Sequence, residues 1–282
     1  RAPFPYSPFA ASRRLRDEVA ATTRLAGPMV ATNLAQIGMS TTDAVVMGWL
    51  GPQALAAGTL GLNLFQPLLI FAIGVMSAIA PMIAADLGRK TRSVHQARRT
   101  ARQGFWLTAA LSALFLPVLW FGEPILLALG QQPDLAAQAA GYLRAMMWSL
   151  PPTILYLALR SFVGALERPG AALAAVAAAF ALNAFLNVGL VFGRFGMPAL
   201  GLPGSGLATT LASLFMALGL AALIRRDRRL RRFHVFGRFW RADLPRLVEL
   251  LRLGGPIGVT TLLESAVFNA AVFIMGRIGA EA

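Results

Sequence analysis

Long apolar stretches are the feature that most restricts how this sequence can fold. A helix needs roughly 20 mainly apolar residues to cross a hydrocarbon layer of about 30 Å, and 57% of the residues are hydrophobic while only 13% are charged. Seven stretches are long enough to cross: 25–50, 54–86, 104–129, 140–165, 171–193, 205–224 and 253–279. Membrane strands would instead show about ten residues of alternating polarity. The sequence therefore predicts an all-α, polytopic transmembrane helix bundle with seven spans in this chain.

The basic residues fall in alternate loops between these stretches. A net charge of +14 could indicate nucleic-acid binding, but its distribution argues against that. The loops at 51–53 and 130–139 contain no Lys or Arg, and the loop at 194–204 contains only Arg194. This is the positive-inside pattern, so we expect a cytoplasmic N-terminus. The run "RRDRRLRRFHVFGRFWR" then contacts the lipid bilayer rather than nucleic acid.

The sequence offers no enzyme site. It has no cysteine, so disulfides and thiolate metal sites are excluded. Its two histidines, His95 and His234, lie in the basic loops without a partner for a metal site or a catalytic triad. We therefore expect a protein that is not an enzyme and that needs no cofactor.

An internal repeat connects the first and last stretches. A shift of 228 positions aligns 24–54 with 252–282 without gaps, and ten of the 31 pairs are identical. The matches include an Arg-Leu pair, a Gly-Pro pair and a Met-Gly pair, which a bias toward apolar residues does not readily produce. The last stretch therefore repeats the first.

This repeat predicts the organisation of the chain. If the seventh span restarts the pattern, the full protein has two parallel, pseudo-symmetric six-helix lobes, and the spans after the seventh are absent from this chain. The expected parts are a cytoplasmic N-terminal segment (1–24), a first six-span lobe (25–224), a basic cytoplasmic linker (225–252) and the first span of the second lobe (253–282). Transporters built from such repeats bind substrate between the lobes.

Several motifs resemble the multidrug and toxic compound extrusion (MATE) family, in its NorM-like branch. They are "LAGPMVATNLAQIGMSTTDAVVMGWLGPQALAAGTLG", "LRSFVGALERPGAAL", "LNAFLNVGLVFGRFGMPALGLPGSGLATT" and "LLRLGGPIGVTTLLES", and the likeness runs from residue 15 to 282. The resemblance implies a multi-pass antiporter of the bacterial inner membrane. It would export cationic amphipathic drugs in exchange for Na⁺ or H⁺, and we expect it to be a monomer.

Two acidic residues lie inside predicted spans, whereas the other ten, Asp86 among them, lie at loops or span ends. Asp43 is in the first span and Glu264 is near the middle of the seventh. A charge at the centre of a membrane helix costs about 2.5–3.5 kcal/mol, so such residues usually serve function. The family resemblance also assigns Asp43 and Glu264 to its acidic membrane positions. We expect both to bind the substrate and the coupling ion, with a Na⁺ near either one.

Polar residues accompany these acids at helical spacing. Asn33, Gln36, Ser40 and Asp43 fall on one face of a helix, and Thr260 lies four residues before Glu264. Asn183 and Asn187 share a face of the fifth span, where they could either line the cavity or only join helices. The residues expected to support the polar cavity are Asn33, Gln36, Ser40, Asn183, Asn187 and Thr260.

The expected mechanism is competition for a carboxylate. A carboxylate of low solvent exposure either pairs with a cation or takes up a proton, so a drug cation and a coupling ion would exclude one another. The alternative function is a lipid-linked oligosaccharide flippase of related fold, which should line its cavity with several Arg or Lys. Arg144 and Arg160 are the candidates for that role, and both lie toward span ends.

Overall fold

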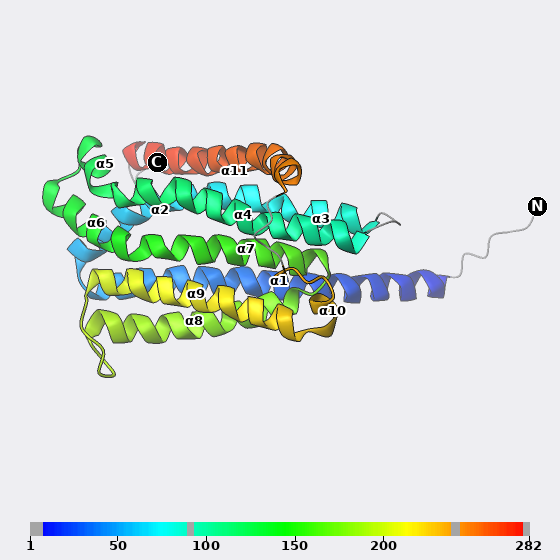
Figure 1. The fold of residues 1–282 in the computed structure, drawn as a ribbon. Helices are drawn as coiled ribbons and strands as arrows, with labels where there is room; N and C mark the ends of the chain where they lie inside the picture. Colours follow the sequence, from blue (N-terminus) through cyan, green and yellow to red (C-terminus); the bar gives the residue numbers. More distant parts are fainter. Residues whose placement is uncertain (1–7, 89–92, 238–242, 279–282) are drawn as a thin grey trace, which may run out of the picture.

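The computed structural model describes residues 8–88, 93–237 and 243–278, and these residues form helices and connecting turns without a strand (Figure 1). The elements are α1 (Pro8–Trp49), α2 (Pro52–Ser77), α3 (Ile79–Gly88), α4 (Ser93–Trp120), α5 (Gly122–Ala128), α6 (Pro133–Met146), the 3₁₀ turn η1 (Met147–Ser149), α7 (Leu150–Ala165), α8 (Pro169–Phe192), α9 (Leu202–Arg226), α10 (Arg228–Arg231) and α11 (Leu244–Ile278). The all-α prediction is confirmed for the described residues.

Each predicted span falls on one helix or on a pair of helices that continue one another. Four stretches of the described chain are long and apolar enough to cross a membrane: 52–88, 94–120, 169–192 and 202–226. The predicted span at 25–50 lies within α1, whose polar stripe lowers its hydropathy. The span at 140–165 is divided by η1 between α6 and α7. Residues 253–278 of the predicted span at 253–279 lie on α11, and the side chains are described as far as Val267.

Prolines and glycines set several helix boundaries. Pro52, Pro133 and Pro169 occupy the first helical position of α2, α6 and α8, where the missing N–H of proline would have no partner in any case. Gly193 ends α8 in the left-handed conformation, with a φ of 69°, which a residue with a Cβ adopts at a cost. These residues place the connections at the two ends of the bundle.

The helices run nearly parallel to one another, and α11 packs along α2 and α4 (Figure 1). Glycines allow the backbones of α2 and α11 to approach closely, since a Cβ added to Gly74 would lie 2.5 Å from Cα of Gly258. Gly254 and Gly258, four residues apart on α11, both face α2. Small residues at this spacing are a common means of packing helices in membranes.

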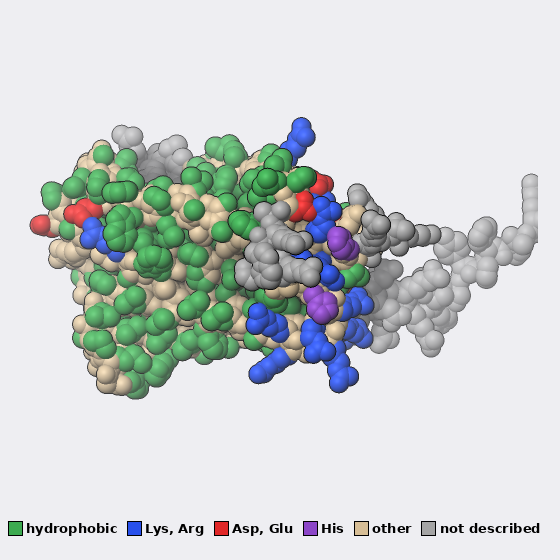
Figure 2. All heavy atoms as spheres, viewed as in Figure 1, with side chains coloured by type: hydrophobic (Ala, Val, Ile, Leu, Met, Phe, Trp, Pro, Cys, Tyr) green, Lys and Arg blue, Asp and Glu red, His purple; other side chains and the backbone are tan. Residues whose placement is uncertain are grey.

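The basic side chains are distributed unevenly along the length of the helix bundle. Figure 2 shows Arg side chains gathered at the end that carries α10, while hydrophobic side chains cover most of the remaining surface in that view. We call the end with α10 the basic end. The turn between α8 and α9 lies at the opposite end of the bundle (Figure 1).

The segment after α9 folds back onto the basic end rather than hanging free. Arg98 of α4 donates a hydrogen bond from Nε to the carbonyl of Phe233 at 2.6 Å, and the Phe233 ring packs edge-on against Phe162 of α7 with centroids 5.6 Å apart. Phe233 is fully buried. The predicted linker (225–252) thus contributes residues such as Phe233 to the hydrophobic core of the helix bundle.

Candidate functional site

Asp43 lies at a junction of three helices. It is buried on α1, with 6% of its surface exposed. Its Oδ1 accepts hydrogen bonds from the side-chain amides of Asn187 at 2.7 Å and Asn183 at 3.2 Å, both on α8. The Thr209 hydroxyl on α9 donates to Oδ2 at 2.8 Å. The structure therefore brings together Asp43 and the two asparagines that the sequence predicted.

All the partners of Asp43 are neutral. Among the described residues, no Lys, Arg or His lies within ion-pair distance of its carboxylate. The side-chain oxygens of Asn183 and Asn187 are buried, and neither accepts a hydrogen bond from the described chain. Buried charges are normally paired with an opposite charge, whereas this carboxylate is held by three neutral hydrogen-bond donors. The amide oxygens beside it are of the kind that bind cations such as Na⁺.

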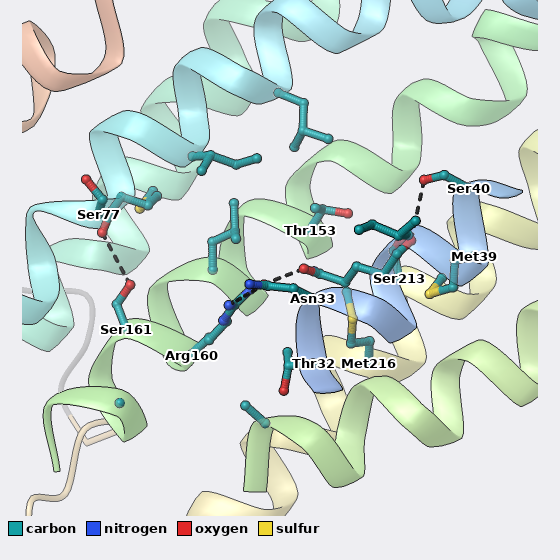
Figure 3. Close-up of a pocket in the computed structure, with 18 of the residues that line it drawn as sticks. Thr32, Asn33, Met39, Ser40, Ser77, Thr153, Arg160, Ser161, Ser213 and Met216 are labelled. Atoms are coloured by element: carbon teal, nitrogen blue, oxygen red, sulfur yellow. Dashed lines mark hydrogen bonds between the residues drawn. The ribbon is translucent and has the colours of Figure 1, made fainter. Parts of the chain in front are cut away.

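A large cavity opens beside this cluster. It has a volume of about 850 Å³ and is bounded mainly by α1, α2, α3, α7 and α9 (Figure 3). Most of the lining is apolar, with Phe65, Met76, Met146, Leu157 and Met216 among the residues. Sites for small molecules are typically about 300–1,000 Å³, apolar, and equipped with a few polar groups. The volume and the mainly apolar lining of this cavity are within that range.

The predicted polar stripe of α1 lines the cavity but divides between two sets of partners. Asn33, Gln36, Ser40 and Asp43 all lie in its wall. Asp43 contacts α8 and α9, whereas Asn33 and Gln36 turn toward α7. Ser40 donates only a long hydrogen bond, at 3.5 Å, to the carbonyl of Gln36. The four residues thus share one wall of the cavity, but periodicity does not show which neighbouring helix each of them contacts.

Arg160 of α7 lies in the cavity wall. Its Nη2 donates to Oδ1 of Asn33 at 2.7 Å and its Nη1 donates to Oε1 of Gln36 at 3.1 Å, and Figure 3 shows the side chain pointing toward Asn33. Arg160 was named as a candidate for lining the cavity despite its position toward a span end, and its long side chain reaches the cavity wall from there. Arg144, by contrast, pairs with Glu123 at 3.1 Å on an exposed surface.

Thr209 is a site residue that the sequence analysis did not assign. A pattern could have found it, since Ser205, Thr209 and Ser213 recur every four residues on the apolar helix α9. Residues at this spacing share a helical face. Ser205 and Ser213 are buried, and Thr209 and Ser213 line the cavity.

Glu264 and Thr260 are not part of this site. Both are exposed on α11, and neither lines the cavity. Glu264 accepts no hydrogen bond from another described residue. The structure thus does not bring the predicted acid of the seventh span together with Asp43.

Asp86 corrects another expectation. It was grouped with the acids of exposed loops and span ends, but it is 2% exposed. Its Oδ2 accepts hydrogen bonds from Thr100 of α4, at 2.8 Å, and from Arg246 of α11. The reason is that α4 and the beginning of α11 fold over the end of α3, so a helix terminus becomes an interior position.

Comparisons with known proteins agree on one family. A sequence model of the MatE family matches residues 28–189. The chain is 52% identical over 266 residues to the "Probable multidrug resistance protein NorM" of Mesorhizobium japonicum, covering 94% of this chain and 57% of that relative. It is 44% identical to the protein of the same name from Brucella suis, covering 94% and 56%. The chain thus spans about half the length of the curated relatives it matches.

Solved structures with similar folds include two transporters. A MATE transporter of Vibrio cholerae, VcmN in the bent form, gives a TM-score of 0.77 at 18% identity and covers 93% of this chain and 58% of its own. An outward-facing multidrug resistance MATE family transporter gives a TM-score of 0.72 at 21% identity, covering 88% and 54%. At these identities the likeness concerns the fold alone.

Proposed function

The chain belongs to the MatE family, and from that premise we propose that it works in a multidrug efflux transporter. In this proposal the transporter is a secondary active antiporter of the bacterial inner membrane. It exports cationic amphipathic compounds in exchange for Na⁺ or H⁺. The observation that carries the proposal is Asp43, a buried carboxylate in the wall of a drug-sized cavity whose described partners are all neutral.

The proposed mechanism follows from that carboxylate. A drug cation in the cavity and a coupling ion at Asp43 would each neutralise the same negative charge, and two cations sharing one carboxylate repel each other. The amide oxygens of Asn183 and Asn187 and the Thr209 hydroxyl would supply further oxygen ligands for Na⁺. A proton, in contrast, would bind to the Asp43 carboxylate without needing these additional ligands. Binding of the ion therefore expels the drug.

Orientation and domain organisation are part of the same proposal. The basic end faces the cytoplasm, consistent with the positive-inside rule and with the gathering of Arg and Lys there. Residues 25–224 form the first lobe, and 253–282 begin the second. Glu264 would serve the second lobe, as the family resemblance implies, and the transporter is proposed to act as a monomer.

The experiment is gradient-driven efflux of a fluorescent organic cation. The full-length protein in inverted vesicles is given a pH gradient and a Na⁺ gradient separately. Wild-type protein should transport with one of them, which names the ion, and Asp43→Asn should reduce transport to the level of vesicles without the protein. The control is Asp134→Asn, which neutralises an exposed acid on α6 outside the cavity and should transport normally.

Two results would count against the proposal. Gradient-driven transport by Asp43→Asn at the wild-type rate would return this carboxylate to a packing role. Transport by Glu264→Gln at the wild-type rate would remove Glu264 from the mechanism while leaving Asp43 in it.

One observation favours the flippase alternative, namely Arg160 in the cavity wall. A pyrophosphate-linked lipid should require several cationic groups, because each phosphate carries its own charge. Among the described residues that line the cavity, Arg160 is the one Lys or Arg. Antiport is therefore the better-supported function, and absence of gradient-driven efflux from folded protein would favour the flippase.

A further inference from the structure

Four charged residues join the beginning of α11 to the helices before it. Arg246 of α11 pairs with Asp86 of α3, and Arg99 of α4 pairs with Asp243, which directly precedes α11. We call the contact of α11 with α2, α3 and α4 the α11 interface. Each of its two sides contributes one acid and one base, so the ion pairs that hold it together all cross from one side to the other.

The α11 interface is tightest near the first turns of α11. Leu250, Gly254 and Gly258 are buried there, and a Cβ added to Gly258 would lie 2.9 Å from Cγ2 of Val75 on α2. Beyond Gly258 the packing changes, since none of the described side chains at 259–267 is buried. Within the part of α11 whose side chains are described, the close contact is therefore confined to the half that carries the ion pairs.

Arg246 divides its guanidinium between this interface and its own helix. Across the interface, Nη2 donates to Asp86, and Nε and Nη2 donate to the Thr100 hydroxyl at 3.0 and 2.8 Å. Within α11, Nη1 donates to Glu249 at 2.6 Å, three residues further along the chain. The Arg246 side chain is 14% exposed, whereas that of Glu249 is 59% exposed. If α11 moved away from α3, Arg246 would lose Asp86 and keep Glu249 as a counter-charge.

An ion pair of this kind suits a contact that opens and closes. The attraction between two buried charges is largely offset by the cost of removing both from water, so separating them returns hydration to each. An apolar contact has no such compensation, because opening it exposes apolar area to water. The pair between Asp86 and Arg246 can therefore fix the position of α11 and still be broken reversibly, the more so because Glu249 stays with Arg246.

This arrangement lies where the proposed lobes meet. In the proposed organisation α11 begins the second lobe, and transporters built from two repeated lobes work by rocking one against the other. We propose that Arg246, with Asp86 and Glu249 as alternative partners, is an ionic lock that holds the two lobes together at the basic end and releases them during the transport cycle. This inference rests on the proposed function and names residues that control its conformational change.

The test measures how often the α11 interface opens. Val75 is fully buried against α11, and the chain has no cysteine, so Val75→Cys in a full-length protein without other cysteines provides one reporter thiol. The rate of its reaction with a maleimide in detergent, relative to the rate in denaturant, reports the open fraction. The rate is measured for the reporter alone and together with Asp86→Asn, Glu249→Gln or Asp227→Asn.

The two partners of Arg246 should give opposite results. Asp86→Asn should raise the labelling rate by about tenfold to a hundredfold, because a hydrogen bond between charged groups across the interface is lost. Glu249→Gln should lower the rate by about twofold, since Arg246 then has no counter-charge when the interface is open. Asp227→Asn is the matched control. It removes an acid at the basic end whose partner, Arg168, lies outside the interface, and it should leave the rate unchanged.

Two outcomes would overturn the ionic lock. The first is labelling of Asp86→Asn at the rate of the reporter alone. The second is faster labelling of both Asp86→Asn and Glu249→Gln, which would mean a general loosening of α11 rather than a choice between partners. The labelling requires no gradient, so it decides the lock even if the efflux experiment shows no transport and the antiport proposal fails.

Discussion

Two buried aspartates, Asp43 and Asp86, lie in different parts of the molecule and are held in different ways. Both are almost fully removed from solvent, and both accept a hydrogen bond from a threonine hydroxyl at 2.8 Å. Asp86 also accepts from the guanidinium of Arg246, whereas the remaining partners of Asp43 are asparagine amides. The difference is one positive charge.

That charge distinguishes the two carboxylates. At Asp86 the protein itself supplies the counter-charge, so the pair can connect α3 and α4 to the first turn of α11 without any ligand. At Asp43 the described protein supplies only neutral hydrogen-bond donors, which leaves the carboxylate free for the ion binding that we propose. Burial alone therefore does not indicate a transport site, because what matters is whether a cationic side chain completes the group.

The largest effect, a loss of thermal stability, is expected when the ion pair between Asp86 and Arg246 is broken. Replacing Arg246 with Met leaves Asp86 buried without its counter-charge, which typically costs about 3–5 kcal/mol. We expect the melting temperature of the full-length protein in detergent to fall by about 10 °C, as followed by intrinsic fluorescence. This variant removes the cationic partner of Asp86 and leaves a buried aspartate with only neutral partners, as at Asp43.

A double variant serves as the control. Asp86→Leu combined with Arg246→Met removes both charges, and buried ion pairs can often be replaced by apolar residues at little cost. The double variant should recover most of the lost melting temperature. If Arg246→Met alone melts like the wild type, Asp86 does not need its partner and the contrast with Asp43 disappears.

A smaller effect, on ion binding, is expected when one hydrogen-bond donor to Asp43 is removed. Thr209→Val keeps the side-chain shape but deletes the O–H donor to Oδ2. A hydrogen bond to a charged group contributes about 1.5–3 kcal/mol, so the ion concentration for half-maximal efflux should shift by about tenfold to a hundredfold. The measurement is efflux from inverted vesicles over a series of Na⁺ concentrations or pH values.

The adjacent residue provides a matched control. The Thr210 hydroxyl donates to the carbonyl of Ala145 at 2.8 Å rather than to Asp43, and Thr210 does not line the cavity. Thr210→Val should therefore leave the half-maximal ion concentration unchanged. Equal shifts in both variants would mean that the effect comes from the packing of α9 and not from the carboxylate.

The sequence predicted faces of helices better than it predicted partners across helices. Periodicity places Asn33, Gln36, Ser40 and Asp43 on one side of α1, and all four lie in the cavity wall. It carries no information on which neighbouring helix meets each residue. Asp86 was misjudged for that reason, since a position near a span end does not show whether another segment folds over the residue.

The smallest expected effect on thermal stability concerns Asp227, a partly exposed carboxylate at the basic end. The backbone N–H of Arg229, at 2.8 Å, lowers the pKa of Asp227, and the N–H of Leu230 and the charge of Arg168 act in the same direction. Asp227 caps α10. Because its ionised form is favoured in the folded state, it adds stability above the pKa of the unfolded chain, about 4, and loses that contribution as the pH falls through the folded value.

Asp227→Ala should therefore cost about 1 kcal/mol at pH 7, seen as a melting temperature about 2–4 °C lower. The difference from the wild type should shrink as the pH is lowered from 5 to 3. Asp227→Asn retains a capping oxygen and loses only the charge, so its deficit at pH 7 should be smaller. A deficit of Asp227→Ala that stays constant down to pH 3 would show that this side chain acts through its shape, unlike Asp43 and Asp86, where charge is the deciding property.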